Sequence, residues 1–144
     1  MKLKAVVTIT CIVFAIFSCK QTVPDPIRYN ADHCNNCGMT ISNPVFAALL
    51  FTKKGRTYKF DDIACLMSFK KDNADKAVGA SIYLANFIKS NELIPLEKTF
   101  LIKGGTIKSP MGGNTLAFDN QASAQHYATE INAEYVTWNS IDKP

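Results

Sequence analysis

A short internal repeat constrains the fold of this chain more than any other feature. Residues 55–62 (GRTYKFDD) and 113–120 (GNTLAFDN) carry glycine, threonine, phenylalanine and aspartate at the same spacing. The same order of predicted elements surrounds both copies, which a chance match of eight residues does not explain. A repeat of this kind indicates one supersecondary unit used twice, so the two halves are expected to share a topology.

Each half is predicted to be a β-β-α-β unit. The first half has predicted strands at residues 45–51, 56–60 and 81–87, a turn at 53–55, and a helix at 63–71 capped by Asp61 or Asp62. The second has predicted strands at 99–102, 114–118 and 135–138, a loop or irregular hairpin at 104–113, and a helix at 122–131 capped by Asp119 or Asn120. Residues 92–96 are expected to connect the units, which span residues 30–92 and 93–144. Helices packed on two small sheets make an α+β protein.

The first 29 residues are expected to be a lipoprotein signal and a tether. Lys2 and Lys4 precede an apolar run at residues 5–17, which is too short for a comfortable membrane span of roughly 20 residues. Ile16-Phe17-Ser18-Cys19 resembles a lipobox, so residues 1–18 are predicted to be cleaved and Cys19 to be lipidated. Residues 19–29 then form an extended tether. An uncleaved anchor is the alternative, and either anchor places the chain in the cell envelope, on the inner or outer membrane and facing the periplasm.

Charge and cysteine content exclude two classes of protein. Lys2 and Lys4 belong to the predicted signal, which leaves 14 basic against 12 acidic side chains and a charge of about +2. The basic residues are scattered, so nucleic-acid binding is not expected. Of the five cysteines, Cys11 is lost with the signal and Cys19 is acylated, which leaves three. An odd number cannot pair fully within the chain, so a disulfide-stapled scaffold is not expected.

The remaining cysteines suggest soft-metal chemistry. Cys34-Asn35-Asn36-Cys37-Gly38-Met39 places two thiols and a thioether together, with His33 just before them. Thiolates and thioethers favour Cu(I). Haem attachment is excluded because Gly38 stands where histidine is required. A structural zinc site completed by Cys65 and His33 stays open. A thiol–disulfide oxidoreductase using Cys34 and Cys37 is disfavoured, because Gly38, Thr40 and Ile41 do not suit the helix start that lowers a thiol pKa.

Three residues are the main candidate copper ligands. Gly38 lets the backbone bend so that Cys37 and Met39 face one ion. Met111 lies in a Pro-Met-Gly-Gly turn, which suits a presented thioether better than a core residue. Cys34 and Cys65 are further candidates, and His33 is an accessory one. Met67 is expected in the core and His126 on the surface.

Taken together, these residues resemble the NosL family of copper-binding lipoproteins that assist assembly of nitrous-oxide reductase. The matching motifs are the lipobox, Cys34-x-x-Cys37-Gly-Met39, Phe46-Ala47-Ala48, Phe60-Asp61-Asp62-Ile63-x-Cys65, Tyr83-Leu84-x-Asn86-Phe87, Pro110-Met111-Gly112-Gly113 and Ala117-Phe118. The resemblance implies a periplasmic Cu(I) carrier whose functional cysteine is Cys37 and whose methionines are Met39 and Met111. Asn86 departs from the acidic residue expected in the family.

The expected function is therefore that of a lipid-anchored, non-enzymatic metallochaperone. Its cargo would be Cu(I), and its partner a copper-dependent reductase, most simply nitrous-oxide reductase, or the proteins that assemble it. A copper-bridged dimer is one expected form. The alternatives are the thiol oxidoreductase, a lipoprotein whose cysteines are structural or hold zinc, and a site for mercury.

Overall fold

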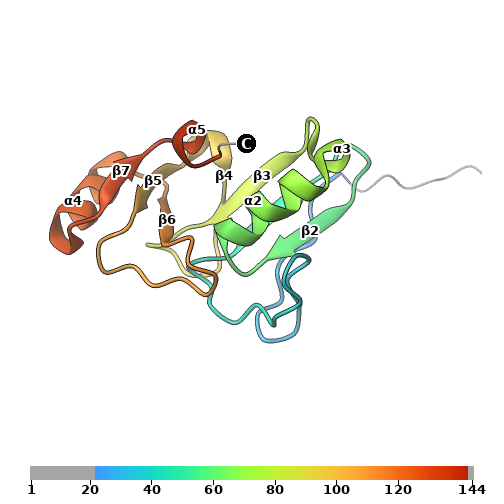
Figure 1. The fold of residues 1–144 in the computed structure, drawn as a ribbon, viewed down its shortest axis with the longest axis horizontal. Coiled ribbons are helices and arrows are strands. Elements are labelled where there is room, and N and C mark those ends of the chain that lie inside the picture. The colour runs from blue at the N-terminus through green and yellow to red at the C-terminus, as the bar shows by residue number, and fades with distance from the viewer. Residues whose placement is uncertain (1–21, 143–144) are drawn as a thin grey trace, which may run out of the picture.

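The computed structural model describes residues 22–142, which form two antiparallel sheets with helices packed against them (Figure 1). The predicted signal peptide and Cys19 lie outside the described residues. Within residues 22–142, no helix is both long and apolar enough to cross a membrane. The elements are β1 (Ala48–Phe51), β2 (Thr57–Phe60), α2 (Ile63–Asp72), α3 (Ala74–Ala77), β3 (Ser81–Ala85), β4 (Leu93–Pro95), the 3-10 helix η1 (Leu96–Lys98), β5 (Phe100–Lys103), β6 (Thr115–Phe118), α4 (Gln121–Ile131), β7 (Glu134–Val136) and α5 (Trp138–Ile141).

The three strands of each repeat unit are arranged in the same order, which agrees with the shared topology expected from the repeat. The first sheet has the order β2-β1-β3-β4 and the second β6-β5-β7. In each, the first strand of the unit lies between the second strand and the strand that follows the helix, and all pairs are antiparallel. The α+β fold with two β-β-α-β units is therefore confirmed.

Local sequence explains why the repeat folds the same way twice. β2 and β6 cover the same four positions of the repeat, and α2 and α4 start at equivalent positions. Phe60 and Phe118 end these strands with fully buried rings. Asp62 then caps α2 by accepting a hydrogen bond from Ala64 N at 2.8 Å. Asn120 caps α4 by accepting one from Ser123 N at 3.0 Å. A side-chain acceptor at this position satisfies an otherwise unpaired amide of the first helical turn.

Some boundaries differ from the sequence prediction. Residues 92–96 were expected to be a connection, but Leu93–Pro95 form β4, which pairs with β3 because Ile94 is apolar and buries its side chain. β1 starts at Ala48 because Asn43 accepts a hydrogen bond from Val45 N and turns the chain. α3 and α5 were not predicted, since four residues are too short for a helical pattern.

Each unit contributes residues to the hydrophobic core of the other. Leu101 and Ala117 of the second unit belong to the first core, and Phe46 of the first unit belongs to the second core. Asn86 and Ala117 form a parallel bridge between the units, and Phe87 N donates to Ala117 O at 2.9 Å. These contacts fix the residues that follow β3 against β6, where the two units meet.

The described part of the predicted tether lies against the first sheet. Residues 22–29 contain no helix or strand. Asp25 N donates to Thr57 Oγ1 at 3.0 Å, and Lys59 Nζ donates to Pro26 O at 2.7 Å. This segment therefore enters the fold along β2.

Candidate metal centre

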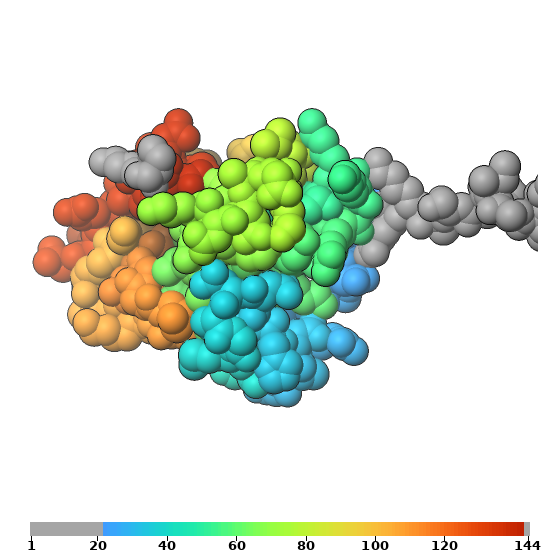
Figure 2. Space-filling view, turned by 45° about the vertical axis from the view of Figure 1, so that its right-hand side comes forward, coloured from blue at the N-terminus to red at the C-terminus, as the bar shows by residue number. Residues whose placement is uncertain are grey.

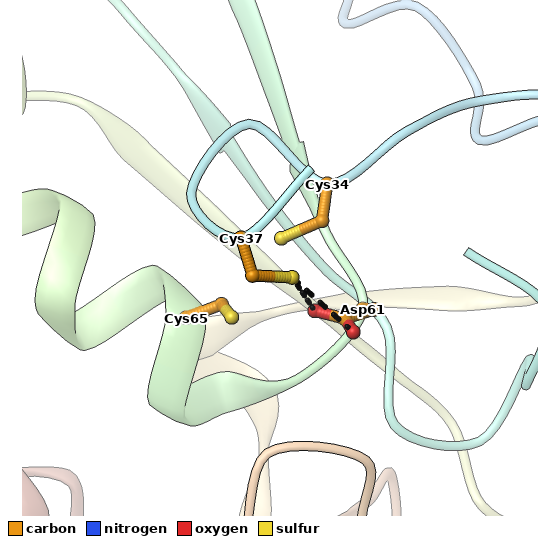
Figure 3. A group of neighbouring side chains, drawn as sticks. All are labelled: Cys34, Cys37, Asp61 and Cys65. Atoms are coloured by element: carbon orange, nitrogen blue, oxygen red, sulfur yellow. Dashed lines mark hydrogen bonds between the residues drawn. The ribbon is translucent and has the colours of Figure 1, made fainter. Parts of the chain in front are cut away.

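Three thiols and one carboxylate converge at the start of α2. The potential ligand atoms of Cys34, Cys37, Asp61 and Cys65 all lie within 4.8 Å of one another. Figure 3 shows their side chains pointing toward a common space, from the loop before the first sheet, the end of β2 and the first turn of α2. We call these four residues the cysteine cluster.

A tight turn presents Cys34 and Cys37. Cys34 N donates to Met39 O at 2.8 Å, and Gly38 N donates to Cys34 O at 2.9 Å. Gly38 has φ of +77°, a conformation that glycine adopts without strain. The bend predicted at Gly38 and the absence of a helix are both confirmed, because residues 34–39 form no helical segment.

The loop of residues 30–41 is fixed to β2 by a buried carboxylate. Asp32 is 8% exposed and accepts hydrogen bonds from Arg28 Nη2 at 2.8 Å and from Lys59 Nζ at 2.6 Å. Burial alone would raise the pKa of Asp32, but the hydrogen bonds from Lys59 and Arg28 outweigh burial and hold the pKa well below its usual range. Asn35 N also donates to Lys59 O at 2.8 Å. These bonds set the position of both loop thiols.

Within the cluster, Cys37 is the most accessible member. Cys34, Asp61 and Cys65 are 3%, 3% and 2% exposed, whereas Cys37 is partly exposed. The Cys37 thiol donates to the Asp61 carboxylate, with Sγ at 3.5 and 3.6 Å from its two oxygens. Burial raises the pKa of Cys34, and burial with the neighbouring Asp61 carboxylate raises that of Cys65. The cluster therefore has a buried interior and one accessible edge, at Cys37.

A second carboxylate ties the Met111 loop to the same helix start. Asp62, 1% exposed, caps α2 with one oxygen. Its other oxygen accepts hydrogen bonds from Ser109 Oγ at 2.6 Å and Met111 N at 2.8 Å. The Met111 loop thus lies beside α2, although 46 residues separate Met111 from Cys65 in the sequence.

The predicted residues separate into three groups. Cys34, Cys37 and Cys65 belong to the cluster, and all three are free cysteines. Met39 and Met111 are exposed, at 52% and 44%. His33 is exposed and is not in the cluster, because it alternates with the buried Asp32 and Cys34 along a strand-like segment.

Met67 packs against the first core and His126 is exposed, as expected. Sequence reasoning missed Asp61 as a ligand candidate. The available signal was its place after the buried Phe60, in the Phe-Asp-Asp-Ile-x-Cys stretch that also carries Cys65.

The donor set suits a metal ion with affinity for sulfur. Three thiols and a carboxylate can supply two or three soft ligands to Cu(I), or four ligands to Zn(II). Because thiols must lose their protons to bind metal, the cluster would release protons on binding.

Comparisons with known proteins identify the fold and the family of the chain. No curated protein sequence matches the chain at a significant level. Among solved structures, the fold matches the crystal structure of the copper chaperone NosL from Shewanella denitrificans with a TM-score of 0.67 and 16% identity, over 81% of this chain and 96% of that one. At this identity the match establishes the fold. The family model of NosL matches residues 27–144, and the chain therefore belongs to the NosL family.

Proposed function

We propose that this protein is a Cu(I) carrier that hands copper to another protein. The observation that carries the proposal is the convergence of three free thiols within 4.8 Å, with one of them at the accessible edge. Thiolates are preferred ligands of Cu(I), which is stable with only two or three of them. The similarity of the fold to a structure described as a copper chaperone supports the same cargo.

Cys37 is the central ligand in this proposal. It is the only partly exposed member of the cluster, so an incoming ligand of a client protein can reach a metal bound there. Met39 follows Cys37 after one residue, and Met111 is held beside α2 by Asp62. Both are exposed, and their thioethers would complete a low-coordinate site or take part in transfer. Cys34 and Cys65 supply thiols from the buried side.

A non-enzymatic role fits the electrostatics of the cluster better than thiol–disulfide exchange. An exchanging thiol needs a lowered pKa, which a helix start or a nearby cation provides. Cys34 and Cys37 lie in a turn, and burial raises the pKa of Cys34. The side chain of Asp61 also acts to raise the pKa of Cys34.

A structural zinc site is the second candidate, and Asp61 favours it. Cys34, Cys37, Asp61 and Cys65 provide four possible ligands at one point, which matches the coordination number of structural zinc. The ligand that completes the set is Asp61, whereas the sequence suggested His33. Zinc at this site would join the loop, β2 and α2, and would leave no position open for transfer.

The family and the N-terminal sequence suggest client and location. Membership of the NosL family makes nitrous-oxide reductase, or its assembly proteins, the proposed recipient. Cys19 and the apolar run before it support lipidation and attachment to a membrane of the cell envelope, with the folded part in the periplasm. A copper-bridged dimer through the exposed Cys37 edge is a further proposed form.

Metal selection tests the proposal against its zinc rival. The reduced chain from Lys20 onward, which contains every described helix and strand, is offered Cu(I) and Zn(II) together, and the bound metals are counted by native mass spectrometry. A carrier retains one Cu(I) in the presence of excess zinc. Retention of zinc in preference to Cu(I) would establish the structural role instead. If no metal is bound and Cys34 and Cys37 form a disulfide with an oxidising reduction potential, the oxidoreductase would be favoured.

A further inference from the structure

The end of the molecule opposite the cysteine cluster carries exposed basic and apolar side chains. Lys53 and Lys54 form the β1–β2 turn and, with Lys76 and Val78, line one hollow of about 250 Å³. Arg56 and Lys76 both lie over the Tyr58 ring, at 5.1 and 6.0 Å from its centroid, so Arg56 belongs to the same group. We call Lys53, Lys54, Arg56, Lys76 and Val78 the basic end.

These side chains are exposed, and Lys53 and Lys76 also contact neighbouring residues. Lys53 lies across Gly79, where an added Cβ would collide with its side chain. Lys76 donates to Asn73 Oδ1, and its ammonium also lies 5.6 Å from the centroid of the Phe69 ring. Val78 is 71% exposed, among the most exposed of the large apolar residues described. Val78 is thus an exposed apolar side chain bordered by the lysines that line the same hollow.

The described chain begins at the same end. Asp25 N donates a hydrogen bond to Thr57 Oγ1 at the start of β2, which follows the β1–β2 turn. Val23, two residues earlier, is 67% exposed. In Figure 2 the blue start of the described chain adjoins the green surface of the β1–β2 region. The residues that precede it in the sequence include Cys19 and the apolar run at 5–17, so a membrane anchor would attach to the molecule here.

We propose that the basic end lies on the surface of an anionic phospholipid membrane and orients the folded domain on it. The charged residues of this end include four basic ones, Lys53, Lys54, Arg56 and Lys76, together with Asp75 of the hollow and Asp25 of the entering chain. At an anionic bilayer each lysine strengthens association by about fivefold. A short lipid anchor combined with basic residues binds a membrane more firmly than either alone. The exposed valines would lie at the level of the lipid headgroups.

This orientation places the cysteine cluster away from the membrane. Cys65 is in the first turn of α2, whereas α3, which carries Lys76 of the basic end, follows the last turn of α2 (Figure 1). A ten-residue helix spans about 15 Å. The accessible edge at Cys37 would thus face the aqueous side, open to a soluble partner. The inference is independent of the metal, because no cluster residue takes part in it.

Amine footprinting of the full-length chain tests the inference. The protein is reconstituted into vesicles of neutral phosphatidylcholine, or of the same lipid with anionic phosphatidylglycerol. A water-soluble acylating reagent is added, and acylation of each lysine is measured by mass spectrometry. We expect Lys53 and Lys54 to react several-fold more slowly on the anionic vesicles, and Lys103 and Lys108 of the second unit to react equally on both. High salt should remove the difference, because it screens surface charge.

Two matched charge reversals complete the test, with Lys76 as the reporter. In Lys53→Glu/Lys54→Glu, Lys76 should lose its protection on anionic vesicles, whereas in Lys103→Glu/Lys108→Glu it should keep it. Equal acylation of Lys53 and Lys54 on both lipids, or equal protection of all four wild-type lysines, would overturn the inference. Those wild-type comparisons decide the question even if a charge-reversed variant folds poorly.

Discussion

Replacement of Asp62 by alanine should cost far more stability than loss of a helix cap. Asp62 and Asn120 occupy equivalent positions of the repeat and cap α2 and α4. A lost cap costs about 1 kcal/mol. Asp62 alone also accepts hydrogen bonds from Ser109 Oγ and Met111 N. Each bond to a buried carboxylate is worth about 1.5 kcal/mol, reduced where water can replace it. We therefore expect a loss of about 3 kcal/mol in Asp62→Ala and about 1 kcal/mol in Asn120→Ala.

Urea denaturation measures this difference directly. Trp138, the single tryptophan of the chain, contacts Lys70 of α2 across the two units and reports on their separation. Asp62→Asn keeps one acceptor oxygen and should fall between the wild type and Asp62→Ala. Amide exchange at Met111 should accelerate in Asp62→Ala and stay unchanged in Asn120→Ala. Equal losses of stability in the two alanine variants would refute the claim that Asp62 joins the units.

Four other variants test three separate parts of the account. Asp32→Asn should lower the free energy of unfolding by about 2–3 kcal/mol at pH 7, because Lys59 loses a buried partner. The pKa of Asp32 is lowered by folding, so its contribution is present above the unfolded pKa of about 4 and is lost as the pH falls below it; a pH-independent difference between the two proteins would contradict this. Gly38→Ala should destabilise the Cys34–Cys37 turn by about 1 kcal/mol through its φ of +77° alone, since an added Cβ meets no atom within 4 Å. Thermal unfolding with and without Cu(I) checks that variant, and an unchanged midpoint would show that the turn is not constrained. Cys37→Ser should weaken Cu(I) binding by more than about 100-fold and Met111→Leu by about 10-fold, and equal small losses in a chelator competition would count against the proposed ligands.

Sequence reasoning succeeded where short-range patterns determine structure. The repeat predicted a β-β-α-β unit in each half, and the side chain that follows Phe-Asp in each copy caps the next helix. The Cys-x-x-Cys spacing predicted that the thiols of Cys34 and Cys37 can reach one ion, and Gly38 predicted a bend between Cys37 and Met39. These features depend on residues only a few positions apart in the sequence. The backbone conformations allowed over so short a distance limit where their side chains can lie.

Long-range contacts were harder to predict. Leu93–Pro95 form a strand because β3 offers an open edge where Ile94 is buried, and nothing near β4 in the sequence reports that edge. Asp61 joins the cluster because β2 ends beside a loop that lies 24 residues earlier. The dual role of Asp62 likewise depends on the packing of the second unit. The burial that sets the thiol pKa values of Cys34 and Cys65 follows from the same tertiary contacts.

A Cu(I) titration of the reduced chain from Lys20 onward tests the central claim most directly. The wild type, Cys37→Ser and the packing control Met67→Leu compete for Cu(I) with a chromophoric chelator, after circular dichroism has shown that all three are folded. The account predicts one tightly bound Cu(I) in the wild type and Met67→Leu, and its loss in Cys37→Ser. No competition by the wild type, or binding in Cys37→Ser as tight as in the wild type, would contradict a copper site centred on Cys37.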